Sequence, residues 1–165
     1  MSAYADTNFL INLYLTRPHS REAQRVLEDF LRRHDEALPF TPLHRLEFRN
    51  AIRLAVFRQA DPGERSLDRG AARRILAEHE SDLSERVFIE HTPIEWTEAL
   101  RQAEVLSKAN TEDKGFRSLD LLHVGTALCL GAKEFFTFDR GAGQLAKLAG
   151  LTVRPSLRSL PALRE

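Results

Sequence analysis

The sequence predicts an α/β fold in which a parallel sheet is covered by helices on both faces. Short apolar runs that are typical of strands alternate with longer runs of helical periodicity, and this alternation indicates strand–helix–strand units. The run 121–132 is apolar or small on nearly every side, which predicts a buried helix. The segment 134–138 is rich in phenylalanine and lies between Gly131 and Gly141, which indicates a buried strand.

The composition is that of an ordinary globular protein. The chain of 165 residues is 42% apolar and 29% charged, which is enough for a core without disulfides. We expect one domain over 1–155 and a weakly structured tail over 156–165. Because the chain starts almost directly on a strand and contains no signal peptide or membrane-length run, we expect a cytoplasmic protein with no membrane partner. The net charge of zero means that nucleic acid binding would need local basic patches.

Apolar spacing and capping residues mark the elements of the first third of the chain. A strand at 2–5 leads through a short turn into an apolar helical run at 9–15. A longer helix follows at 20–34, with serine at its start. A second strand is expected at 37–41, and a helix that Thr41 or Pro42 opens covers 43–59.

The later elements continue the alternation. A polar helix is expected at 66–85 and a third strand at 87–91. An amphipathic helix at 93–108 is followed by the sequence NTEDKG at 110–115, which we interpret as a polar loop. After the buried helix and the strand that follows it, a last short strand is expected at 151–153.

One carboxylate falls on an apolar face of the helix expected at 43–59. At 100 degrees per residue this face combines Glu47 with four apolar residues. These apolar residues are Leu43, Leu46, Leu54 and Phe57. On the far side a stripe of arginines is formed by Arg45, Arg49 and Arg53. We interpret the stripe as a solvated helix face, and a ridge that contacts phosphates is the alternative.

Three further acids lie at strand ends or beside apolar segments. Asp6 ends the first strand, where it could line a ligand site or, like Asn8, cap the next helix. Asp120 lies in the first turn of the buried helix, behind Ser118 as the expected N-cap, and Asp139 follows a later strand. A carboxylate beside a core destabilises the folded state unless its charge is compensated. One bound cation would compensate the charge of several carboxylates.

The residue types favour a hard cation over zinc or a phosphate loop. Oxygen ligands without cysteine or histidine partners suit Mg²⁺ or Mn²⁺. His123 lies three residues after Asp120 and could share its face, but we interpret it as a hydrogen-bonded core histidine. Gly141 and Gly143 lack the remaining residues of a phosphate-binding loop, and no GxSxG motif is present.

Four segments carry a family resemblance. The segments ADTNFLINLY, LEFRNAI, RSLDLLHVGTAL and FFTFDRGAGQLAKLAGL occur in this order. They resemble the successive motifs of PIN-domain ribonucleases, and in particular those of the VapC toxins of bacterial toxin–antitoxin pairs. The resemblance runs from Ala3 to about Pro155 and implies a three-layer α/β/α fold with a central parallel sheet.

The resemblance also implies the site. The residues that match the acidic positions of the family are Asp6, Glu47, Asp120 and Asp139. By the resemblance, Asp6 and Asp120 are the surest ligands of Mg²⁺ or Mn²⁺, and the other two acids complete the shell directly or through water. Thr7 matches the small hydroxyl neighbour of the first acid and would contact a ligand or the substrate.

Two arginines flank the acids and are candidates for substrate binding. Arg117 and Arg140 could neutralise phosphate charge, or they could form ion pairs with the neighbouring acids. The resemblance implies a metal-dependent endoribonuclease that cleaves phosphodiester bonds of RNA, with tRNA or ribosomal RNA as its target. It also implies a cognate antitoxin as partner and a homodimer.

Three other functions are compatible with parts of the pattern. A DNA nuclease of the wider PIN-like group is one, although the chain is short for the extra helical elements of such enzymes. A phosphatase of the haloacid dehalogenase type is disfavoured, because Asp6-Thr7-Asn8 lacks the second aspartate of its motif. A non-catalytic RNA-binding or scaffold domain is the third, and it gives no reason for four partly buried carboxylates.

Overall fold

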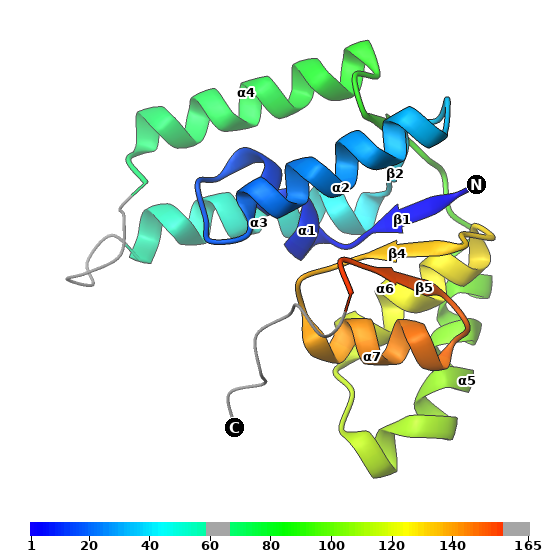
Figure 1. Ribbon diagram of the computed structural model, residues 1–165. Coiled ribbons are helices and arrows are strands. Elements are labelled where there is room, and N and C mark those ends of the chain that lie inside the picture. The colour runs from blue at the N-terminus through cyan, green and yellow to red at the C-terminus, as the bar shows by residue number, and fades with distance from the viewer. Residues whose placement is uncertain (59–66, 157–165) are drawn as a thin grey trace.

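The computed structural model describes residues 1–58 and 67–156 (Figure 1). The end of the helix expected at 43–59, the start of the helix expected at 66–85 and nearly all of the expected tail therefore lie outside the described residues. In chain order the described elements are β1 Ala3–Ala5, α1 Thr7–Tyr14, α2 Ser20–Arg33, β2 Leu38–Phe40, α3 Pro42–Phe57, α4 Arg69–Glu85, β3 Ile89–His91, α5 Trp96–Lys114, α6 Ser118–Cys129, β4 Glu134–Phe136, α7 Arg140–Leu148 and β5 Thr152–Arg154. No helix in these two ranges combines the length and the apolar character that crossing a membrane requires.

The strands pair in parallel, which confirms the predicted sheet type. β4 lies between β1 and β5, and β2 pairs with β3. β1 also lies beside β2, but among the described residues the two strands do not share a hydrogen-bonded ladder. One cause is His44 of α3, whose Nε2 lies 2.8 Å from the carbonyl oxygen of Ala5 and occupies an acceptor on that side of β1.

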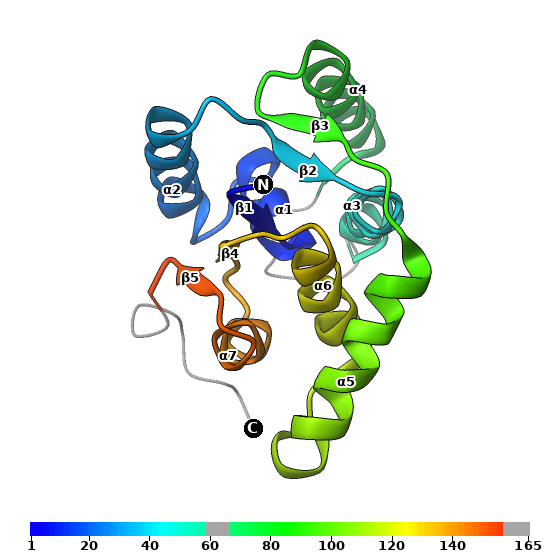
Figure 2. The same cartoon turned by 90° about the vertical axis from the view of Figure 1, so that its right-hand side faces the viewer.

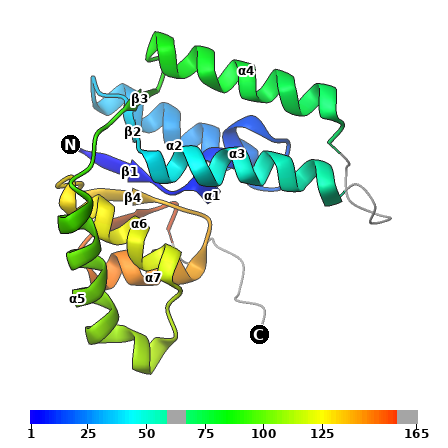
Figure 3. The same ribbon diagram turned by 180° about the vertical axis from the view of Figure 1, so that it is seen from behind.

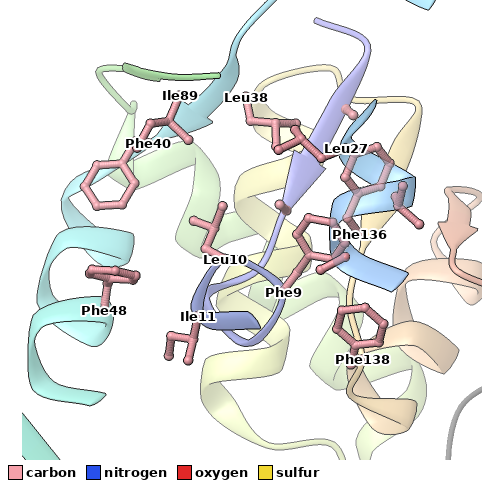
Figure 4. Packing of buried hydrophobic residues seen from close by; sticks show 14 of the residues in the cluster. Phe9, Leu10, Ile11, Leu27, Leu38, Phe40, Phe48, Ile89, Phe136 and Phe138 are labelled. Atoms are coloured by element: carbon pink, nitrogen blue, oxygen red, sulfur yellow. The ribbon is translucent and has the colours of Figure 1, made fainter. Parts of the chain in front are cut away.

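Helices cover both faces of the strands, as the sequence predicts. Alternate residues of β1 and β4 point to opposite faces, so that Ala5 and Phe136 join one core and Tyr4 and Phe135 the other. The first core packs against α1 to α4, and in it Phe136 and Phe138 pack on Phe9 (Figure 4). The second core packs against α5 to α7, on the opposite side of the strands (Figure 2).

The apolar helix expected at 121–132 is α6, and it is buried against α5. A Cβ atom at Gly125 would lie 2.6 Å from the carbonyl oxygen of Ala99, so only glycine permits this close approach of the two helices. Ser118 is the first helical residue and not the N-cap. Arg117 occupies the N-cap position without a side-chain capping bond.

The segments 110–114 and 140–148 are helical, although the sequence did not predict helices there. The segment expected as a loop at 110–115 continues α5 to Lys114, and the helix ends at Gly115 with a φ of 66°. Asn110 Nδ2 donates to the carbonyl oxygen of Leu106 one turn earlier, which satisfies a polar side chain within the helix. Similarly, the two glycines after Asp139 lie inside α7, a helix that periodicity did not indicate.

The apolar face that we expected for α3 is largely exposed. Leu46 is 71% and Phe57 81% exposed. The buried residues are Leu43, His44, Phe48 and Ile52. The prediction failed because it counted only apolar residues, whereas the buried face includes His44, which caps its own helix by accepting from the backbone N–H of Thr41. Phe48 of this buried face stacks on His79 of α4, which lies beside α3 (Figure 3).

Candidate active site

A cavity of about 300 Å³ lies where β1 ends and α6 and α7 begin. It is lined by Asp6, Thr7, Asn8, Glu47, Arg117, Ser118, Leu119, Asp120, His123 and Asp139. All four predicted acids, Thr7 and Arg117 thus meet in one place. Arg140, the remaining predicted site residue, does not line the cavity.

A larger open groove of about 580 Å³ lies between α2 and β5. None of the predicted site residues lines it. Several of its charged side chains pair with each other, such as Arg25 with Glu22 and Arg32 with Asp29. Because this lining is balanced in charge and solvated, we assign the chemistry to the smaller cavity.

Asp6 caps a helix and also lines the cavity. It caps α1, because its Oδ1 accepts from the backbone N–H of Phe9 at 2.8 Å. Its Oδ2 accepts a hydrogen bond of 2.5 Å from the hydroxyl of Thr137. The carboxylate is 4% exposed and still forms part of the cavity wall.

Asp139 repeats this geometry at the start of α7. Its Oδ1 accepts from the backbone N–H of Ala142 at 3.0 Å, and its own N–H donates to Thr137 Oγ1 at 2.8 Å. Thr137 therefore connects the ends of β1 and β4. Thr137 was not among the residues predicted for the site, and its signal in the sequence is a hydroxyl two positions before an acid at a strand end.

Two acids of the cavity, Asp6 and Asp120, hold their protons more tightly than free carboxyl groups. Burial raises the pKa of Asp6 to about 6, against the opposing effects of His123 and of its hydrogen bonds. Burial also raises the pKa of Asp120, and the charge of Asp139 adds to both shifts. Arg117 acts in the opposite direction on Asp120. Burial thus outweighs the nearby positive charge at both Asp6 and Asp120.

The donor set fits a hard divalent cation. Asp6, Asp120 and Asp139 supply only oxygen, the ligand that Mg²⁺ and Mn²⁺ favour. A Cβ atom at Gly141 would lie 3.2 Å from Asp139 Oδ1 and 3.9 Å from Asp120 Oδ2, so glycine leaves open a space that both oxygens face. Within 1–58 and 67–156, no three acidic, histidine or cysteine side chains converge closely enough to form a ready-made metal site.

Glu47 is bound by two side chains from other helices. Its Oε2 accepts from Thr7 Oγ1 at 2.7 Å and lies 2.5 Å from His123 Nε2. Burial opposes ionisation of Glu47, but the bonds from His123 and Thr7 outweigh it and lower its pKa. His123 Nδ1 lies 2.8 Å from the hydroxyl of Tyr4. His123 is therefore a bonded core histidine, as expected, and also a partner of a candidate catalytic residue.

The arginines divide into two groups. Arg117 is exposed beside the cavity, and no ion pair joins it or Arg140 to any residue in the described part of the chain. The predicted alternative, pairing with the neighbouring acids, is not observed there. Arg49 of the stripe on α3 instead pairs with Glu80 of α4 at 2.5 Å, and Arg45 approaches the same carboxylate at 4.0 Å.

The chain matches the model of a known family, and its fold is similar to that of solved structures. The family model of the PIN domain matches residues 3–148. The structure is similar to one of VapBC2 from Rickettsia felis bound to a DNA fragment from their promoter, with a TM-score of 0.63, 14% identity, and coverage of 93% of this chain and 98% of that chain. It is also similar to FitAcB from Neisseria gonorrhoeae, with a TM-score of 0.63, 16% identity, and coverage of 96% and 99%. No curated protein sequence matches the chain. At these identities the structural likeness concerns the fold.

Proposed function

The chain belongs to the PIN domain family, whose members are generally nucleases, and on this premise we propose that it is a metal-dependent endoribonuclease acting as the toxin of a toxin–antitoxin pair. The observation that carries the proposal is the meeting of Asp6, Asp120 and Asp139 in one cavity. They come from three separate parts of the chain, and the pKa values of Asp6 and Asp120 are raised. Such clusters of perturbed carboxyl groups are typical of functional sites.

We assign different roles in hydrolysis to the residues in and beside the cavity. Asp6 and Asp120 would hold Mg²⁺ or Mn²⁺, with Asp139 and Glu47 completing the shell directly or through water. When bound, the ion supplies Lewis acidity toward a phosphodiester and lowers the pKa of a bound water. Arg117 is exposed at the cavity and would neutralise phosphate charge on the substrate. Arg140 begins α7 and would act only on phosphates farther along the RNA.

The proposed partners are an RNA substrate, a cognate antitoxin and a second copy of the chain. Support comes from the resemblance of the four motifs to VapC toxins and from the fold shared with the VapBC2 and FitAcB structures. Transfer RNA or ribosomal RNA is the proposed target. A PIN-like DNA nuclease and a non-catalytic RNA-binding scaffold remain the competing functions, and the same assay separates all three.

The assay compares the purified protein with its Asp120→Asn variant on tRNA, ribosomal RNA and single-stranded DNA. We expect the wild type to cleave RNA with Mg²⁺ or Mn²⁺, and we expect chelator or the substitution to abolish cleavage while circular dichroism stays unchanged. Cleavage of DNA alone would favour the DNA nuclease. Tight RNA binding without cleavage under any metal would favour the scaffold.

The toxin assignment needs a separate experiment in cells. Induced expression of the wild type should arrest growth, whereas Asp120→Asn should not. A small neighbouring reading frame, expressed together with the toxin, should restore growth and yield a stable complex. Normal growth and intact bulk RNA under strong wild-type expression would contradict the toxin assignment without contradicting nuclease activity in vitro.

A further inference from the structure

Glu47 lines the cavity, and one of its two carboxylate oxygens already forms hydrogen bonds with other side chains. Thr7 and His123 both bind Oε2, and no described side chain donates to Oε1. A carboxylate that is bound through one oxygen by two donors from different helices cannot rotate without breaking both bonds. Glu47 therefore has a defined orientation in which Oε1 is the oxygen available to water, substrate or a cation.

His123 is itself held at both ring nitrogens. Nε2 faces the Glu47 carboxylate, which only accepts hydrogen bonds, so Nε2 carries a hydrogen. Nδ1 lies 2.8 Å from the hydroxyl of Tyr4. The imidazole is 5% exposed and Tyr4 is fully buried, so this chain of three side chains runs from the cavity into the core.

Tyr4 anchors the inner end of this chain on the sheet. It belongs to β1, two residues before Asp6, and its ring stacks on Phe135 of β4 with centroids 5.7 Å apart. A second histidine, His44, packs on the same ring with centroids 4.8 Å apart. The strand that positions Asp6 thus also positions Glu47, through Tyr4 and His123.

We propose that His123, supported by Tyr4, is a positioning residue of the nuclease site, and that it holds Glu47 so that the carboxylate presents Oε1 alone to the cavity. This inference rests on the proposed function for its effect on rate, but its hydrogen bonds can be measured without any substrate. Loss of His123 would leave Glu47 held by Thr7 alone, so that the carboxylate could turn both oxygens toward the other acids. Partners of this kind, when removed, typically reduce metal affinity or activity about 10–100-fold.

The kinetic test uses three variants. His123→Leu removes the donor at similar volume, His123→Gln keeps an N–H near the position of Nε2, and Tyr4→Phe keeps the packing but removes the support. We expect His123→Leu to lower kcat about 10–100-fold with little change in KM for RNA. The glutamine variant should recover most of this loss, and Tyr4→Phe should lie between. On a Glu47→Gln background, His123→Leu should have no further effect.

Nuclear magnetic resonance of the imidazole gives a readout that is independent of activity. We expect His123 to show a protonated Nε2 in the metal-free wild type, and its signal should shift in Glu47→Gln. If the wild type cleaves no RNA, the proposed function fails and this spectrum alone decides the positioning of Glu47. An unprotonated Nε2, wild-type kcat in His123→Leu, or equal losses in the leucine and glutamine variants would overturn the inference. If His123→Leu does not fold, the other two variants decide. Wild-type kcat in Tyr4→Phe, together with wild-type kcat in a His123→Gln protein that is active with metal but has lost the bond to Glu47, would overturn the inference.

Discussion

The hydroxyl of Thr137 donates a hydrogen bond to Asp6 Oδ2 at 2.5 Å and accepts one from the backbone N–H of Asp139 at 2.8 Å. One buried side chain thereby sets the spacing of two candidate metal ligands that are far apart in the sequence. Thr137→Val keeps the shape of the side chain and removes both bonds. We expect it to lower the free energy of unfolding by about 1–3 kcal/mol, because two buried polar groups lose a partner.

Thr137→Val also tests whether the two hydrogen bonds of this hydroxyl contribute to RNA cleavage. We expect Thr137→Val to reduce RNA cleavage about 10–100-fold, as loss of an orienting partner does. Thr137→Ser keeps the hydroxyl and is the matched control, which should stay close to the wild type in denaturant unfolding and in activity. Equal behaviour of the valine and serine variants would show that the hydroxyl contributes nothing to either property.

The positions of Asp6, Asp120 and Asp139 could be predicted because each acid interrupts or ends an apolar segment. Parallel strands place their carboxyl ends at one edge, which accounts for the meeting of Asp6 and Asp139. Thr137 could not be predicted in the same way. A threonine in a strand is ordinary, and its role depends on which backbone and carboxyl groups the fold brings near it.

The errors in the fold have a related origin. Periodicity shows which residues are apolar but not which polar residues find partners in the core. His44 is fully buried because Thr41 and Ala5 satisfy its ring nitrogens, so the buried face of α3 is rotated away from Leu46. Likewise Asn110 continues α5, because its side chain bonds within the helix. A tertiary partner, Ala5, contributed to the first case, and a bond within the helix accounts for the second.

The raised pKa of Asp6 predicts an unusual pH dependence of stability in chelator. The pKa is about 6 in the folded protein and 3.8 in the reference state, so the folded state retains a proton that the unfolded state has released. Stability from this group is therefore present below about pH 4 and is lost as the pH rises through 6. A difference of about two pKa units between the folded and unfolded states corresponds to about 3 kcal/mol of stability at most.

Asp6→Asn isolates this contribution, because asparagine can still cap α1 and does not titrate. We expect the wild type to lose up to about 3 kcal/mol relative to Asp6→Asn between pH 4 and pH 7 in denaturant unfolding. Acids with lowered pKa values, such as Glu134, act in the opposite direction but are present in both proteins. At pH 7, Mg²⁺ or Mn²⁺ should restore the free energy of unfolding of the wild type but should not change that of Asp6→Asn. A constant difference across this range would contradict a raised pKa for Asp6.

Arg117 and Arg49 provide a matched pair for testing phosphate contacts. Arg117 is exposed at the cavity, whereas Arg49 is bound to Glu80. In the cleavage-deficient Asp120→Asn background, we expect Arg117→Gln to weaken RNA binding and to reduce the slope of log K against log salt by about 0.7–0.9. Arg49→Gln should leave that slope unchanged and cost at most about 1 kcal/mol of stability. Equal slopes in the two variants would assign no phosphate contact to Arg117.

Two glycines in equivalent helix positions allow stability and function to be separated. Gly141 follows the N-cap Asp139 by two residues in α7, and Gly70 follows the N-cap Asp68 by two residues in α4. A Cβ atom would lie 3.2 Å from the capping Oδ1 at Gly141 and 3.0 Å from it at Gly70. Only at Gly141 would the methyl group also approach a second acid, Asp120, at 3.9 Å from its Oδ2.

The two alanine variants should therefore agree in stability and differ in activity. Alanine gains up to about 1 kcal/mol over glycine in a helix, and the close approach to the capping oxygen offsets part of that gain at both sites. We expect both melting temperatures to lie within about 4 °C of the wild type. Gly141→Ala should weaken the stabilisation by Mn²⁺ in thermal melts and lower RNA cleavage, because its methyl group fills the space that the oxygens of Asp120 and Asp139 face. Gly70→Ala should do neither. If Gly141→Ala keeps the full metal-induced shift, the ion does not bind between these two carboxylates.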